Sequence, residues 1–316
     1  MNSRLKKLTK CQSFWPLMVL LAILLVNGVV SGGAFFQMRI VDGHLYGRLI
    51  DILRNGSKLM LLATGMTMVL ATGGTDISVG SVMAISGAIA CSVVDGRILS
   101  SLGGSVTAAV LIAVLAGVLC GAWNGLLVSK IKIQPIVATM ILMVAGRGIA
   151  QLITDGKIVT VNSDAYYFIN GGYILGLPFP LFIVGFFVLL IMLFTKKTAF
   201  GLFVESTGCN PVSSRFAGIK GADCNNAGLM IEMDAILAVA IGGTSLAGGR
   251  FSIPASIVGA LIIQSITTSV YAMGVAPEVT QVVKALIVVA ICLAQSKKFK
   301  AAVAARLTSR KAVSAA

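Results

Sequence analysis

Apolar stretches recur along almost the whole chain, and they limit its possible folds more than any other feature. Of its 316 residues, 57% are hydrophobic and only 11% are charged. Apolar windows give about nine candidate spans, at 14–34, 57–72, 79–95, 104–128, 135–154, 177–194, 231–243, 252–273 and 279–295. The windows 57–72, 79–95 and 231–243 fall short of the ~20 residues that a full crossing needs. We therefore expect an all-α, polytopic membrane protein of about nine spans.

Basic residues account for the net charge of +14 and gather at the ends of the apolar spans. In a soluble chain such a charge suggests nucleic-acid binding, but this distribution is typical of the cytoplasmic ends of membrane helices. We expect lipid contact, no nucleic acid and a cytoplasmic N-terminus. The first apolar stretch resembles a signal peptide, and we interpret it as an uncleaved first helix. The tracts are Arg4 to Lys10, Lys130 with Lys132, Lys196 with Lys197, and a basic tail at 296–316.

A glycine-rich segment occurs twice. ATGGTDISVG (71–80) aligns with AIGGTSLAGG (240–249) at an offset of 169 residues, with five of ten positions identical. Short spans interrupted by glycine at corresponding positions of two halves indicate a transporter built from repeated units. We predict repeat halves at about 49–197 and 220–295, each with one broken helix that lines the translocation pathway. The predicted pathway residues are Gly73, Gly74, Asp76, Ser78, Gly80, Gly242, Gly243, Thr244, Gly248 and Gly249.

Asp76 lies inside the first glycine segment, where an isolated charge in hydrocarbon costs about 2.5 to 3.5 kcal/mol on insertion scales. With Ser78, it is placed to accept the unpaired N–H groups of a helix that begins near Val79. The alternative is direct contact with substrate. Polar residues inside other spans either line the path or form interhelical hydrogen bonds; these are Asn124, Arg147, Gln264, Gln281 and Lys284. Glu232 and Asp234 precede the second break, where acids favour a helix N-terminus.

Several enzyme classes are excluded by missing motifs. The chain has no G-x-x-x-x-G-K-[ST] sequence, so ATP hydrolysis would require a partner. It has one histidine and no H-E-x-x-H motif, which argues against a zinc protease. Its six cysteines have no C-x-x-C spacing. We expect no catalytic residues, no metal site and no cofactor bound by this chain, although a membrane-embedded enzyme is retained as an alternative.

Five motifs together resemble the permease subunit of ribose/galactose-type ABC sugar importers, and most closely its galactofuranose-type branch. The motifs are ATGGTDISVGSVMA, GAWNGLLV, KIQPIVATMILMVAGRGIAQLIT, GADCNNAGL and IGGTSLAGGRF. The resemblance covers about 49–295. It implies a single transmembrane permease domain in the bacterial inner membrane that translocates a monosaccharide: galactofuranose or galactose, or less directly ribose or arabinose.

The resemblance also implies partners. These are cytoplasmic ATPase subunits that use ATP and Mg, a periplasmic sugar-binding protein, and a second permease subunit that is either identical or different. The segment 198–219 matches the cytoplasmic coupling segment that docks on the ATPase. Pro211, Ser213 and Ser214 depart from the alanine-rich run usual there. The residues expected to couple are Gly201, Glu205, Gly208, Asn210 and Gly218.

One membrane span is missing relative to this resemblance. FAGI runs directly into KGADCNN at Ile219 and Lys220, where the family has a further helix. Nine crossings would place the basic tail outside the cytoplasm, against the distribution of basic residues. A re-entrant 231–243 segment would restore an even number. The alternative function is therefore a transport-defective or regulatory permease-like subunit.

Overall fold

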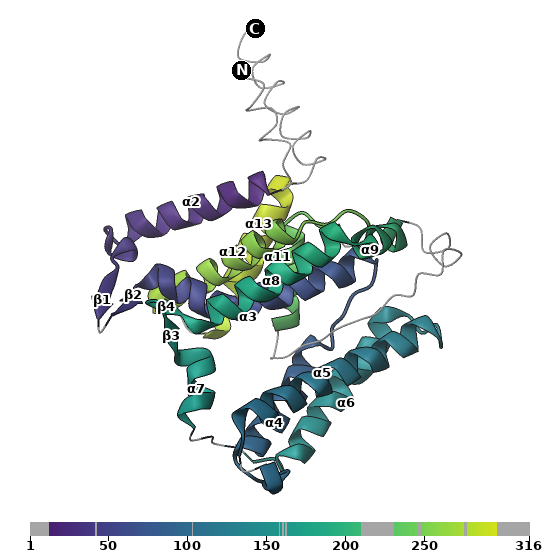
Figure 1. Cartoon of the computed structure of the whole chain (residues 1–316). Coiled ribbons are helices and arrows are strands. Elements are labelled where there is room, and N and C mark those ends of the chain that lie inside the picture. Colours follow the sequence, from purple (N-terminus) through teal and green to yellow (C-terminus); the bar gives the residue numbers. More distant parts are fainter. Residues whose placement is uncertain are drawn as a thin grey trace.

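The computed structural model describes residues 13–295 apart from 42, 103, 158, 160, 162, 210–230, 246–247 and 275–276. These residues are mostly helical, with two short antiparallel hairpins (Figure 1). The hairpins pair β1 (Arg39–Val41) with β2 (His44–Tyr46), and β3 (Tyr173–Ile174) with β4 (Leu177–Pro178). The α-helices are α2 (Phe14–Val30), α3 (Arg48–Ala71), α4 (Val79–Val94), α5 (Val106–Ser129), α6 (Pro135–Ile153), α7 (Asp164–Gly171), α8 (Phe179–Lys197), α9 (Ala199–Cys209), α11 (Ile231–Ile241), α12 (Ile253–Ala272) and α13 (Pro277–Gln295).

The predicted spans coincide with nine of these helices, but one prediction of length was wrong. Helix α3 has 24 residues and starts at Arg48, nine residues before the apolar window 57–72. At 1.5 Å per residue it is about 36 Å long, enough to cross a bilayer. The window missed its first turns because Arg48, Asp51 and Arg54 lower the local hydropathy. Within the described part of the chain, α5, α6, α8 and α12 are long enough and apolar enough to cross a membrane.

Proline and glycine set several helix ends. Helices α6, α8 and α12 each carry a proline in the first turn, where its missing N–H costs no hydrogen bond: Pro135, Pro180 and Pro254. Helix α3 ends where Gly73 adopts a φ of 79°, a left-handed conformation that glycine takes at low cost.

The described helices form two packed groups. Helices α3, α8, α11, α12 and α13 share one hydrophobic cluster, with α2 against its edge, whereas α4, α5 and α6 form a second cluster. The second group lies below the first in Figure 1. Helix α11 of the first group contacts α4 of the second.

Helices α3 and α12 run antiparallel. The N–H of Gly249, just before α12, donates to the carbonyl of Ala71 at the end of α3, at 2.9 Å. Near the other end of α3, a Cβ on Gly56 would lie 3.3 Å from Cγ of Gln264. Helix α12 therefore ends beside the start of α3, and α13 follows after a short connection.

The two ends of the molecule differ in character. The α5–α6 and α8–α9 connections, which carry Lys130 with Lys132 and Lys196 with Lys197, lie at one end, on the right in Figure 1. We name this the basic end. Both β-hairpins lie at the opposite end, the hairpin end, where the N–H of Leu45 donates to the carbonyl of Gly176 at 3.0 Å.

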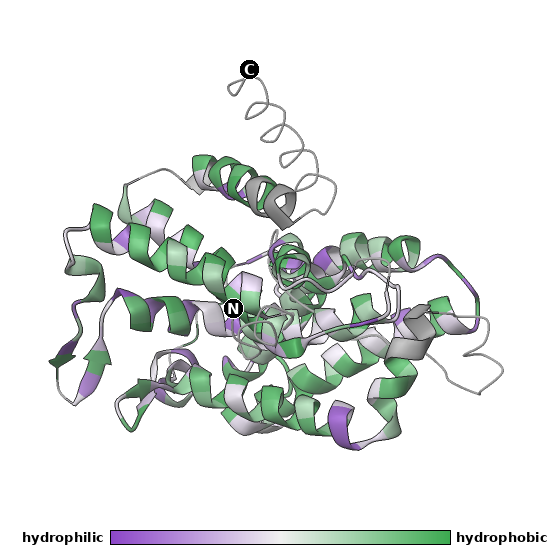
Figure 2. Ribbon diagram, turned by 90° about the horizontal axis from the view of Figure 1, so that it is seen from above, coloured by the Kyte–Doolittle hydropathy of each residue, from purple (hydrophilic) through white to green (hydrophobic). Residues whose placement is uncertain are grey.

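Apolar side chains cover much of the outer surface. Figure 2 shows hydrophobic residues along the helices and most of the strongly hydrophilic ones near the helix ends and in connections. On α5 and α6, Leu111, Leu119 and Val144 are each more than 60% exposed. An apolar surface of this extent indicates contact with lipid.

Candidate functional site

The first glycine segment, between α3 and α4, is seated against α5 and α6. The side-chain amide of Asn124 on α5 donates to Oγ of Ser78 at 3.0 Å, and the N–H of Ile77 donates to Oγ1 of Thr139 on α6 at 3.3 Å. Oγ of Ser81 donates to the carbonyl of Leu142 at 3.0 Å. These bonds satisfy backbone and hydroxyl groups where the helix is interrupted, as a break among apolar helices requires.

Asp76 is fully buried in this segment, and its carboxylate bonds to Ser78. Its Oδ1 accepts from the N–H of Ser78 at 2.8 Å and from Oγ of Ser78 at 2.6 Å. Ser78 is itself the N-cap of α4, so these two bonds fix the cap residue of that helix, and acceptance of first-turn N–H groups by Asp76 stays a prediction. Asp76 and Ser78 stand at positions i and i+2, the spacing of a local side-chain-to-backbone turn.

The second glycine segment follows α11 and brings two helix backbones close together. A Cβ on Gly242 would lie 2.7 Å from the backbone of Ala255, and a Cβ on Gly259 would overlap the carbonyl oxygen of Ala238. Gly243 and Gly249 adopt φ angles of 83° and 95°. With the bond from Gly249 to Ala71, the two repeated segments meet in space.

Glu232, in the first turn of α11, lies at the boundary of the two helix groups. It is 5% exposed, and its Oε1 is 4.0 Å from Nη2 of Arg147 on α6. Its Oε2 has no hydrogen-bond partner among the described residues. A buried carboxylate is stable only when paired, so Arg147 couples α6 to α11.

A cavity of about 510 Å³ opens between α3, α11 and α12. Most of its lining side chains carry hydrogen-bonding groups; two, Leu59 and Ile231, are apolar. The polar residues follow two matching stripes at i, i+4 and i+7, which places each stripe on one helix face. Because α3 and α12 are antiparallel, the stripes face the same space. They are Asp51, Asn55 and Lys58 on α3, and Gln264, Thr268 and Tyr271 on α12.

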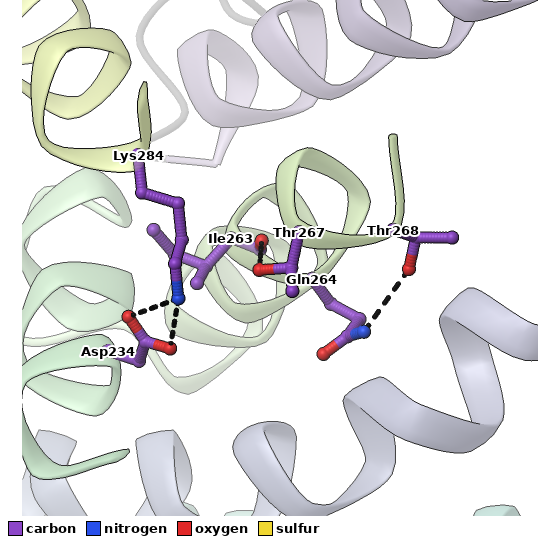
Figure 3. A network of polar contacts seen from close by, with 6 residues as sticks. All are labelled: Asp234, Ile263, Gln264, Thr267, Thr268 and Lys284. Atoms are coloured by element: carbon purple, nitrogen blue, oxygen red, sulfur yellow. Dashed lines mark hydrogen bonds and ion pairs between the residues drawn. The ribbon is translucent and has the colours of Figure 1, made fainter. Parts of the chain in front are cut away.

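Figure 3 shows an ion pair between Lys284 and Asp234, and Asp234 is one of the residues that line the cavity. Nζ of Lys284 on α13 donates to Oδ1 and Oδ2 of Asp234, at 3.2 and 2.8 Å. Nε2 of Gln264 donates to Oγ1 of Thr268 at 3.2 Å, which turns both groups toward one another along α12. Asp234 lines the cavity, so Lys284 fixes a carboxylate at its edge.

The structure brings some predicted residues together and separates others. The segments with Gly73 to Ser78 and with Gly242 to Gly249 meet, whereas Gln264 and Lys284 belong to the cavity. Thr244 is 4% exposed, and its Oγ1 has no partner among the described residues. Gly80 is buried in the first turn of α4.

Sequence reasoning missed most of the cavity. Asp51, Asn55, Lys58, Thr268 and Tyr271 were not predicted, because the apolar windows were read for length and not for polar faces. The signal was available in the i, i+4, i+7 spacing of each stripe. The spacing does not predict that the stripe on α3 and the stripe on α12 face the same cavity.

The predicted coupling segment is described only in part. Gly201, Glu205 and Gly208 lie on α9, at the basic end, whereas Asn210 and Gly218 lie outside the described residues. A Cβ on Gly201 would overlap the carbonyl of Thr195, so the turn from α8 into α9 is tight. Among the described residues no group of three or more His, Cys, Asp or Glu side chains is placed to hold a metal ion.

Comparison with known proteins identifies relatives along nearly the whole chain. The model of a family described as the permease component of the branched-chain amino acid transport system matches residues 48–222. The galactofuranose transporter permease protein YtfT of Escherichia coli K12 is 45% identical, over 90% of this chain and 91% of its own length. The fructose import permease protein FruF of Bifidobacterium longum is 34% identical, over 94% and 91%. The ribose import permease protein RbsC of E. coli K12 is 30% identical, over 88% and 93%. The chain has no significant match among solved structures.

Each alignment has more positions than the number of residues of this chain that it includes. The YtfT alignment has 324 positions but covers 90% of 316 residues, about 284, which leaves about 40 positions with no residue of this chain. The RbsC alignment has 312 positions and covers 88%, about 278 residues, which leaves about 34. In each alignment, the positions without a residue of this chain together outnumber the ~20 residues of one membrane span.

Proposed function

The chain belongs to the family of branched-chain amino acid transport system permease components, and on this premise we propose that it translocates a monosaccharide across the bacterial inner membrane as part of an ATP-driven importer. Galactofuranose or galactose is the first candidate substrate, because YtfT shares more residues with this chain than the ribose and fructose permeases do. Ribose and arabinose are second.

The meeting of the two glycine segments is the observation that supports this function. Repeat-built transporters place interrupted helices at the interface of their halves, where the substrate passes. Here the N–H of Gly249 donates to the carbonyl of Ala71, which joins the two segments directly. The polar cavity lies between the same helices, α3, α11 and α12. In this proposal the α4–α6 group and the larger group rock against each other about this junction.

The partners follow from the two ends of the molecule. The basic end is cytoplasmic by the positive-inside rule, and with it the N-terminus. Helix α9 lies there and meets the ATPase subunits, which bind ATP and Mg, whereas this chain binds no cofactor itself. The hairpin end receives sugar from a periplasmic binding protein. A second permease subunit, identical or different, completes the pathway.

A second candidate function rests on the alignment positions that have no residue of this chain. If the missing positions include the helix between Ile219 and Lys220, the chain is a permease-like subunit that occupies the complex without transporting. Helix α11 has only 11 residues, about 16 Å, and is too short to cross. As a re-entrant helix, α11 would keep eight crossings and a cytoplasmic tail.

Uptake of labelled D-galactose tests both candidates. The chain is expressed in cells that lack their own galactose permeases and supply the ATPase and binding protein, with an ATPase variant that cannot hydrolyse ATP as control. Uptake that depends on ATP hydrolysis is the expected result. Co-purification with the ATPase without uptake supports the transport-defective subunit. If the chain shows no uptake and does not co-purify with the ATPase, both candidate functions are refuted.

A further inference from the structure

The charges around the cavity between α3, α11 and α12 balance. Asp51, Lys58 and Asp234 line it, and Lys284 pairs with Asp234 at its wall, so two carboxylates face two ammonium groups. A balanced site has no net attraction for a cation or an anion. The site therefore favours a ligand with no net charge, such as a neutral polar molecule.

The cavity cannot face hydrocarbon. Lys58 is ten residues into α3, about 15 Å from its start, near the middle of a ~30 Å bilayer core. It is exposed in the described structure, as are Asp51 and Asn55. Charged side chains at that depth lie against water-filled space or protein and not against lipid tails. The cavity is thus a polar vestibule that extends from the hairpin end to mid-depth.

The lining groups match a polyhydroxylated ring. Each sugar hydroxyl both donates and accepts, and the cavity offers carboxylate acceptors, ammonium donors and the amides of Asn55 and Gln264, which do both. Tyr271, which is 52% exposed, supplies a flat apolar face for ring C–H groups, and Leu59 and Ile231 add apolar surface to the same cavity lining. A volume of about 510 Å³ lies in the usual range for small-molecule pockets.

We propose that this cavity is the site at which one monosaccharide pauses during translocation, with its hydroxyls bound by Asp234 and Gln264 and one ring face against Tyr271. Lys284 acts as a positioning residue that holds the Asp234 carboxylate. Gly56 is part of the same site, because its missing side chain leaves room for Gln264 between α3 and α12. This proposal rests on the proposed function and names the place where that function recognises its substrate.

Saturation-transfer NMR with D-galactose tests the site on the full chain in lipid nanodiscs, without ATPase or binding protein. Gln264→Ala and Asp234→Asn are each expected to weaken binding by about two- to tenfold, the effect of one lost hydrogen bond. Tyr271→Ala is expected to abolish transfer to the ring protons. Since Tyr271 is half exposed, this variant leaves the hydrophobic core intact. Asp95→Asn is the matched control, because Asp95 is an exposed residue that pairs with Arg97 and does not line the cavity.

The proposal is overturned if the unaltered chain gives no galactose signal, or if the three cavity variants and the control give equal signals. Uptake of labelled galactose, measured separately, distinguishes the site from the function. Uptake by all three variants at the normal rate also overturns the site while the transport function stands. Binding that depends on the three residues, without uptake, supports the site and refutes transport by this chain.

Discussion

Gly259 on α12 is the position at which the smallest change in sequence should cause a large loss of stability. A methyl group there would overlap the carbonyl oxygen of Ala238 on α11, and it would lie 3.2 Å from the N–H nitrogen of Gly242. Both neighbours are backbone atoms in a helix crossing, and Ala238 is fully buried. Relief of the clash therefore requires α11 and α12 to separate, because no flexible side chain is available to move.

The size of the effect follows from what must be displaced. Overpacking a buried contact costs about 1 to 3 kcal/mol. The intrinsic helix preference of alanine over glycine, about 1 kcal/mol, offsets part of this cost. A clash with rigid backbone belongs at the upper end of the overpacking range, so the net loss is about 2 kcal/mol, which corresponds to a fall in apparent Tm of roughly 4 to 8 °C by the scaling for mid-sized domains.

Gly65→Ala on α3 is the matched control, since a Cβ at Gly65 meets no atom within 4 Å. Both variants are measured by thermal unfolding of the purified protein in the same detergent. We expect Gly259→Ala to lower the apparent Tm and Gly65→Ala to leave it unchanged or raise it slightly. Equal apparent Tm values for the two variants would show that α11 and α12 do not approach as closely as the structure has them.

The remaining predictions concern the first break, the coupling turn and the tail. Asp76→Ala should lower the free energy of unfolding by about 1.5 to 3 kcal/mol, because the charged hydrogen bonds to Ser78 are lost. Asp76→Asn retains an acceptor and should lose less stability in the same unfolding assay. Equal losses for the two variants would contradict this prediction. Gly201→Ala should reduce ATP-dependent uptake at normal protein levels, because its Cβ would overlap the carbonyl of Thr195. Unchanged uptake would show that coupling does not require the tight turn between α8 and α9. A reporter that is active only in the cytoplasm, fused after Ala316, should be active; an inactive fusion at normal expression would exclude a re-entrant α11.

The amino-acid sequence determined the class of protein because its signals are local. Apolarity over ~20 residues specifies a membrane helix wherever it packs, and lysine pairs mark the ends of the same helices. The glycine repeats at 71–80 and 240–249 predicted where helices stop, and α3 and α11 end at Ala71 and Ile241. The family, too, was evident from motifs alone.

The tertiary structure decided which of these segments meet and what they enclose. The polar stripes on α3 and α12 form one cavity only because the helices run antiparallel, in a register set by the contacts of Gly56 and Gly249. The pairing of Glu232 with Arg147 and of Asp234 with Lys284 joins residues far apart in the chain. No local pattern specifies such partners, because they depend on long-range packing of helices whose buried surfaces are mostly apolar and therefore similar in sequence.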